Sequence, residues 1–119
     1  MEKGQIPEDH IIYITGIKVV GGKKQLEMTK DGDVDDAHKN DTVTWIIEPE
    51  SGVKEIQYSK KTGDDVFKDK PAKIQGSENW KGKIKDRLDK QKEEEDYTLY
   101  FITTNGDKGD HDPKISVNN

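Results

Sequence analysis

The sequence contains no cysteine. This absence excludes disulfide bonds, cysteine-ligated zinc sites, iron–sulfur clusters and thiol nucleophiles. The chain also has no apolar run longer than four residues, whereas a membrane-spanning helix needs about 20 apolar residues and the core of a signal peptide about 7 to 15. We therefore expect no membrane span and no export signal, and a cytoplasmic location in preference to an exported one.

Leucine and alanine are scarce. The chain has 3 leucines and 2 alanines, against 19 isoleucines and valines taken together. β-Branched side chains suit the pleated surface of a sheet, whereas Leu and Ala favour helices. The composition therefore predicts an all-β protein.

Apolar residues as a whole make up 29% of the chain, and 38% of the residues are charged. The net charge is only −5, from 25 acidic and 20 basic side chains. Because the charges nearly balance and the apolar residues fall in clusters, we expect a folded chain with a small core. A length of 119 residues predicts one domain over residues 1–119, in which residues 1–9 form a loose N-terminal segment.

Strand patterns follow one another along the chain. The clearest covers residues 41–47, where Val43, Trp45 and Ile47 share one face. Gly16 indicates a bulge or bend within the first block. The other strand-like blocks cover residues 10–20, 25–29, 53–58, 66–67, 97–103 and 114–117. About seven to eight short strands separated by turn signals predict a single Greek-key β-sandwich.

Residues 81–96 do not fit this pattern. They hold 6 basic and 6 acidic side chains, and Ile84 and Leu88 are spaced as on a helix. Two apolar residues are too few to anchor four helical turns. We therefore interpret this stretch as a short strand or a single helical turn followed by a solvated loop that contains the acidic run at residues 93–96.

Four segments carry a resemblance to a known family. Residues 40–45 read Asn-Asp-Thr-Val-Thr-Trp, a turn then leads to Val53, residues 97–100 read Tyr-Thr-Leu-Tyr, and residues 112–117 read Asp-Pro-Lys-Ile-Ser-Val. In this order the segments resemble the cupredoxin-like β-sandwiches, including small uncharacterised bacterial relatives. The resemblance covers about residues 10–118 and implies a cupredoxin-like scaffold. Asn40 replaces the glycine usual in the family.

The copper ligands that this family uses are missing. A type-1 copper site needs two imidazoles and a thiolate. Ser51 and Gly52 stand where the first histidine would follow the Asp-Thr-Val-Thr-Trp strand, and the loop at residues 103–112 retains only His111. The resemblance therefore implies the scaffold without its copper, and we expect no cofactor.

Asp31, Asp33 and Asp35 are candidate metal ligands. Their alternate spacing resembles the start of an oxygen-ligand calcium loop, but an EF-hand wants Gly at the position of Asp36 and Glu at the position of Thr42. A solvated polar turn between strands explains the same residues. We favour the turn and keep the three aspartates as candidates.

No motif indicates catalysis or nucleic-acid recognition. The three histidines lie in separate segments, and no serine has a Gly-x-Ser-x-Gly context. The 19 lysines are accompanied by a single arginine, Arg87, and the lysine run at residues 81–92 is interrupted by Asp86 and Asp89 and followed by four acids. We place Trp80 as a plug at one end of the sandwich in preference to an exposed stacking residue.

Two functional hypotheses remain. The first is a non-enzymatic binding or interaction module on the cupredoxin-like scaffold, in which the polar loops at residues 48–53 and 103–112 lie together and bind a protein or a small ligand. The alternative is a calcium- or cation-stabilised structural or adhesion module that uses residues 31–36.

Overall fold

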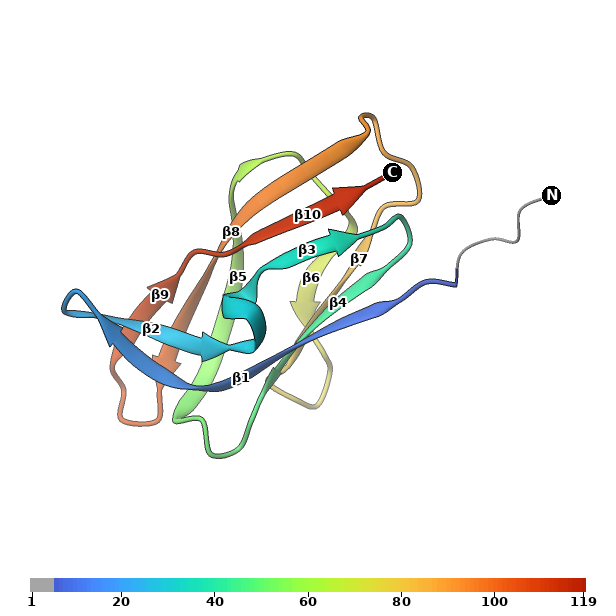
Figure 1. The fold of residues 1–119 in the computed structure, drawn as a ribbon. Helices are drawn as coiled ribbons and strands as arrows, with labels where there is room; N and C mark the ends of the chain where they lie inside the picture. The colour runs from blue at the N-terminus through green and yellow to red at the C-terminus, as the bar shows by residue number, and fades with distance from the viewer. Residues whose placement is uncertain (1–5) are drawn as a thin grey trace.

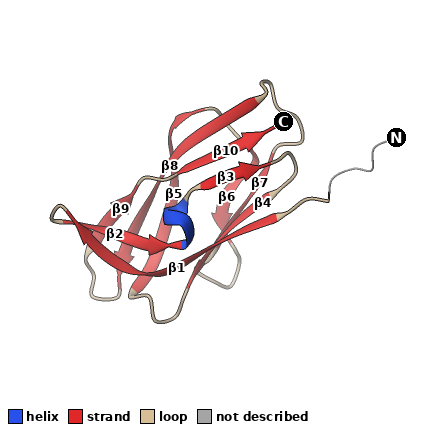
Figure 2. Ribbon diagram, in the orientation of Figure 1, coloured by secondary structure: helices blue, strands red, loops and turns tan. Residues whose placement is uncertain are grey.

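Ten β-strands and one short 3-10 turn form the part of the chain that the computed structural model describes, residues 6–119 (Figures 1 and 2). The strands are β1 (Asp9–Val20), β2 (Lys23–Met28), β3 (Val34–Ala37), β4 (Thr42–Ile47), β5 (Val53–Gly63), β6 (Phe67–Lys73), β7 (Trp80–Ile84), β8 (Lys92–Thr103), β9 (Lys108–His111) and β10 (Lys114–Asn118), and the turn η1 (Thr29–Gly32) joins β2 to β3. The all-β class expected from the composition is confirmed. The number of strands is higher than expected because polar segments such as β3 and β9 also pair.

The strands form two mixed sheets that pack in a sandwich-like arrangement. The first sheet has the order β2-β1-β4-β7-β6, and the second has the order β3-β10-β8-β5 with β9 paired to β8. Both sheets are mixed because β1 pairs in parallel with β4, and β3 pairs in parallel with β10. These two pairs each join strands from distant parts of the sequence.

The bulge expected at Gly16 is present. The register of β1 against β2 shifts between Ile14 and Gly16. The expected loose segment at residues 1–9 lies partly outside the described residues. The last two residues of this segment are ordered by pairing with β4. The Glu8 carbonyl accepts a hydrogen bond from the Thr42 amide at 2.9 Å, and β1 begins at Asp9.

The interpretation of residues 81–96 is confirmed at its beginning and wrong at its end. A short strand, β7, covers Trp80–Ile84, and a loop follows. The acidic run belongs to β8, in which Glu93 and Glu95 are buried beside Tyr97, Leu99 and Phe101 on one face. The run can enter a strand because both buried carboxylates find hydrogen-bond donors there.

Glu93 is held by the loop before β8. The Lys85 ammonium lies 2.8 Å from one carboxylate oxygen, and the Asp89 amide donates to the other oxygen at 2.6 Å. This pair of contacts satisfies a charge that is only 2% exposed. It also fixes the path of the loop between β7 and β8.

Trp45 lies at the centre of the core, with no exposed surface. Its indole N–H donates to the Tyr97 hydroxyl at 3.1 Å, and that hydroxyl donates to the Gly32 carbonyl at 2.6 Å. The rings of Tyr58 and Tyr97 stack 4.9 Å apart beside the indole. The relay from Trp45 to Gly32 joins β4 of one sheet, β8 of the other sheet and the turn η1.

Trp80 packs partly buried against the edge of the core, as expected for a plug. Tyr100 differs from its inward neighbours on β8, because 51% of its surface is exposed on the outer face. No helix in the described part of the chain has the length and apolar character that crossing a membrane requires.

Replacing Trp45 by alanine is expected to lower the free energy of unfolding by about 3–5 kcal/mol, because it opens a cavity in a packed core. It also leaves the Tyr97 hydroxyl without its donor. Urea unfolding followed by circular dichroism measures the loss. Tyr100→Ala is the matched aromatic control and should cost less than half as much, so equal losses would contradict this account of the core.

Candidate functional site

The first half of β1 has a free edge. Residues Asp9–Ile14 pair with β4, whereas β2 pairs with β1 only from Ile14 onward. The Glu48 amide donates to the Ile14 carbonyl at 3.0 Å, and Glu8 bonds to Thr42, so the even-numbered residues of β1 pair with β4. The backbone groups of Asp9, Ile11 and Tyr13 therefore point away from β4. The Tyr13 amide donates to the Thr29 hydroxyl at 3.0 Å, so the open part of this edge is at Asp9 and Ile11.

A second free edge lies opposite the first. β3 pairs with β10 and with no other strand in residues 6–119. Figure 1 shows η1 leading into β3, and residues of β1, η1 and β3 line one groove. A groove of about 370 Å³ lies between the two strands. Its lining consists of Glu8, Asp9, His10, Ile11, Ile12, Thr29, Lys30, Asp33, Val34, Asp35 and Asp36.

The groove is acidic. Five of its lining residues are carboxylic acids, against Lys30 and His10 as the basic ones. Asp33 accepts the Lys114 amide at 2.9 Å, and Asp36 accepts the side-chain amide of Asn118 at 2.9 Å. These bonds orient two of the carboxylates without neutralising them, so the groove attracts positive charge.

The three predicted metal ligands do not converge on one point. Asp31 lies beside Lys18, whose ammonium is 2.8 Å from its carboxylate, and that hydrogen bond lowers the Asp31 pKa. Asp33 and Asp35 both line the groove, and Asp31 does not. Within the described residues, these three side chains do not form a group whose ligand atoms all lie within 4.8 Å of one another.

Three other side chains do place their ligand atoms this close together, and they were not predicted from the sequence. Glu8, His10 and Asp41 each place a ligand atom within 4.8 Å of the other two. Asp41 is buried and holds the turn before β4, where it accepts the amides of Glu8 and His38, both at 2.9 Å. The signal in the sequence was the position of His10 and Asp41 next to two strand starts, which only parallel pairing brings side by side.

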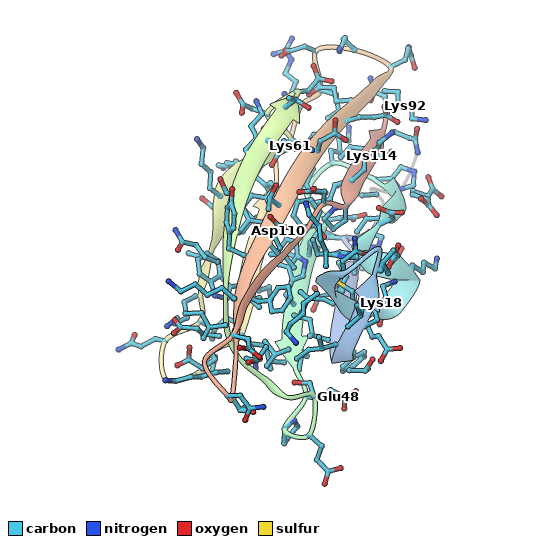
Figure 3. All side chains as sticks on the ribbon, turned by 90° about the vertical axis from the view of Figure 1, so that its left-hand side faces the viewer. Lys18, Glu48, Lys61, Lys92, Asp110 and Lys114 are labelled. Atoms are coloured by element: carbon cyan, nitrogen blue, oxygen red, sulfur yellow. The ribbon has the colours of Figure 1, made fainter. Side chains whose placement is uncertain are left out.

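Of the two segments expected as polar loops, residues 48–53 contact the turn at residues 104–107, whereas Lys108–His111 forms strand β9, which pairs with β8. The Thr104 amide donates to the Gly52 carbonyl at 2.9 Å, and Val53 pairs with Thr103. A shallow hollow of about 420 Å³ lies beside the loop that follows β4, lined by Thr15, Glu48, Pro49 and Glu50. Figure 3 shows Glu48 at this end of the molecule and Lys92 toward the other.

The outer face of the second sheet is covered by paired charges. Lys61 on β5 and Lys114 on β10 project from it (Figure 3). Lys61 lies 3.7 Å from Asp112, and Lys114 lies 3.9 Å from Glu94. Pairing of this kind cancels much of the local field, as expected for a solvated face.

A smaller hollow of about 200 Å³ lies between the edge strands β5 and β6, with the buried acid Glu95 in its lining. Its lining is Tyr58, Lys60, Asp65, Phe67, Lys70, Pro71 and Glu95. Glu95 is 3% exposed and accepts hydrogen bonds from the Tyr58 hydroxyl and, at 3.1 Å, from the Val66 amide. Burial raises the pKa of Glu95. The period of two that buries Tyr97 and Leu99, extended backward along the chain, would have found it.

We expect calcium to have no specific effect on stability, because Asp31 is engaged by Lys18 and is not joined by Asp33 and Asp35. Millimolar calcium should shift the melting temperature no more than magnesium at the same ionic strength, since both act by screening. Differential scanning fluorimetry measures the shift. A calcium-specific rise that disappears when all three aspartates are changed to asparagine would instead support the cation-stabilised module.

Glu95→Gln should change the pH dependence of stability. The unfolded chain ionises Glu95 near its ordinary pKa of 4.5, whereas the folded protein resists ionisation to a higher pH. The stability that this raised pKa contributes is complete below 4.5 and is lost as the pH rises through the folded-state pKa. The free energy of unfolding of the variant, relative to the unmodified protein, should therefore increase across that window in urea titrations.

Glu94→Gln is the control from the outer face of the same strand. Hydrogen bonds from Ser116 and Lys92 lower the Glu94 pKa, so its contribution to stability is present above 4.5 and is lost as the pH falls. As the pH rises, the free energy of unfolding relative to the unmodified protein should thus increase for Glu95→Gln and decrease for Glu94→Gln. A pH-independent difference for Glu95→Gln would contradict the assignment.

Comparison with protein-family models and with curated proteins finds no match for this chain. The functional interpretation therefore rests on the geometry of the chain itself.

Proposed function

We propose that this chain is a non-enzymatic binding module on a cupredoxin-like scaffold that lacks the copper site. The all-β fold of two packed mixed sheets supports the scaffold, as does the contact between the loops at residues 48–53 and 103–107. Asn40 adds support, because its φ of 68° lies in the left-handed region. The family's glycine suits that backbone conformation, and asparagine tolerates it.

The observation that carries the binding function is the pair of free strand edges at one groove. The outward backbone groups of Asp9 and Ile11 face the groove from β1, and β3 lines its other side. An extended peptide can add to such an edge through main-chain hydrogen bonds, as in β-strand addition. We therefore assign the groove between β1 and β3 as the binding surface, in preference to the two polar loops.

The partner we infer is an extended protein segment rich in lysine or arginine. Its backbone would pair with one of the edges, and its alternate side chains would meet the carboxylates of Glu8, Asp9, Asp33, Asp35 and Asp36. Complementary charge raises the rate of encounter and selects the partner. The hydrogen bonds would supply affinity that does not depend on the partner's sequence.

A fluorescent eight-residue peptide of alternating lysine and valine tests this function by anisotropy. Binding should weaken with added salt, and Asp35→Lys should weaken it by about tenfold, since reversal of one groove charge costs roughly 1.4 kcal/mol. Asp110→Lys, an exposed acid on β9 outside the groove, is the matched control and should leave the affinity unchanged.

A second peptide tests the strand edges separately from the charge. Methylation of every second backbone nitrogen removes the hydrogen-bond donors on one edge of an extended peptide and keeps its side chains. Methylation of the pairing set should abolish binding, whereas the sequence-matched peptide without methyl groups should bind. Equal binding of the unmethylated peptide and of both alternately methylated ones would show that charge alone acts, and would reject strand addition.

A further inference from the structure

We propose that Glu8, His10 and Asp41 form a binding site for a divalent transition-metal ion, with zinc as the best match. The site does not rest on peptide binding in the groove, although Glu8 and His10 also line the end of that groove. It is separate from the three aspartates that the calcium hypothesis uses. It also lies before β4, whereas the loop that resembles a copper end follows β4.

The distances between the donor atoms suit a metal. The Nε2 atom of His10 lies 2.9 Å from an Oδ atom of Asp41, and a Glu8 carboxylate oxygen lies within 4.8 Å of both. Zinc binds imidazole nitrogen and carboxylate oxygen at about 2.0–2.2 Å, and tetrahedral geometry then places neighbouring donors about 3.3–3.6 Å apart. The His10 and Asp41 donor atoms would therefore separate by roughly half an ångström to hold an ion, and the exposed Glu8 side chain would supply the third ligand.

The surroundings of Asp41 resemble the outer shell of a metal site. The Asp41 side chain is 5% exposed, and its carboxylate accepts the backbone amides of Glu8 and His38. Such bonds hold a ligating carboxylate in one orientation, and ligands of bound metals are themselves usually hydrogen-bonded in this way. The same two amides leave lone pairs free on both oxygens, so metal binding would replace only the hydrogen bond from His10.

The donor set selects the class of metal. One imidazole and two carboxylates suit zinc, and also cobalt, nickel and copper, which bind nitrogen readily. Calcium and magnesium prefer oxygen ligands throughout. The site leaves further coordination positions to water, because three protein ligands are fewer than the four of a closed structural zinc site.

A bound ion would join two segments that are distant in the sequence. Glu8 immediately precedes β1 and His10 is its second residue, whereas Asp41 ends the turn before β4, 31 residues beyond His10. The ion would thus link the start of β1 to the turn that precedes β4, the central strand of the same sheet. Because the unfolded chain does not hold these groups together, binding would favour the folded state.

Calorimetric titration of the EDTA-treated full chain with zinc chloride tests the site, with cobalt absorption as a second readout. We expect one ion per chain. His10→Ala should weaken zinc binding by at least about tenfold, since loss of even an outer-shell partner typically costs 10- to 100-fold. Glu8→Gln, at an exposed side chain, should weaken zinc binding without endangering the fold. It keeps the proposal testable if His10→Ala does not fold.

Glu50→Gln is the matched control for Glu8→Gln. Glu50 is an exposed carboxylate in the loop between β4 and β5, outside the proposed ligand group. Zinc affinity within about twofold of the unmodified protein in this variant, together with losses in the other two, would support the site. Zinc affinity unchanged by His10→Ala and Glu8→Gln, or no zinc binding at all, would overturn it. These outcomes leave peptide binding in the groove to be judged by its own experiment.

Discussion

The hydrogen-bonded relay from Trp45 through Tyr97 to the Gly32 carbonyl connects the two sheets to each other and to the turn η1. The Tyr97 oxygen accepts the Trp45 indole N–H, and the Tyr97 O–H donates to the Gly32 carbonyl, so both of these buried donors have acceptors. The relay sets the spacing of the two sheets at β4 and β8 and holds the turn η1 against the core. Because η1 leads directly into β3, the position of the groove depends on this contact.

Because the apolar core is small, hydrogen bonds to buried polar side chains also determine how the loops pack. The inner face of β8 carries two glutamates, and each requires donors from outside its own strand. Lys85 and the Asp89 amide serve Glu93, while Tyr58 and the Val66 amide serve Glu95. These partners position the loops before β6 and β8, so polar contacts complete a fold that 29% hydrophobic residues begin.

Both candidate sites follow from the way the strands pair. Parallel pairing of β1 with β4 brings Glu8 and His10 to Asp41, and the late start of β2 leaves the other edge of the first half of β1 without a strand partner. β3 pairs in parallel with β10 along one side, and its other side is the second edge without a strand partner among residues 6–119. A peptide groove and a metal site can therefore lie at neighbouring places without sharing a sequence motif.

The sequence by itself determined the β class, the bulge at Gly16 and the buried face of Trp45, because composition and a period of two are local properties of a chain. It could not assign residues 93–96 to a strand, because the donors that satisfy Glu93 and Glu95 come from other segments. The spacing of Asp31, Asp33 and Asp35 suggested a shared metal site. In the folded chain Asp31 pairs with Lys18, whereas Asp33 and Asp35 line the groove. Only the tertiary structure placed His10 beside Asp41, since parallel pairing joins strands whose separation along the chain carries no signal.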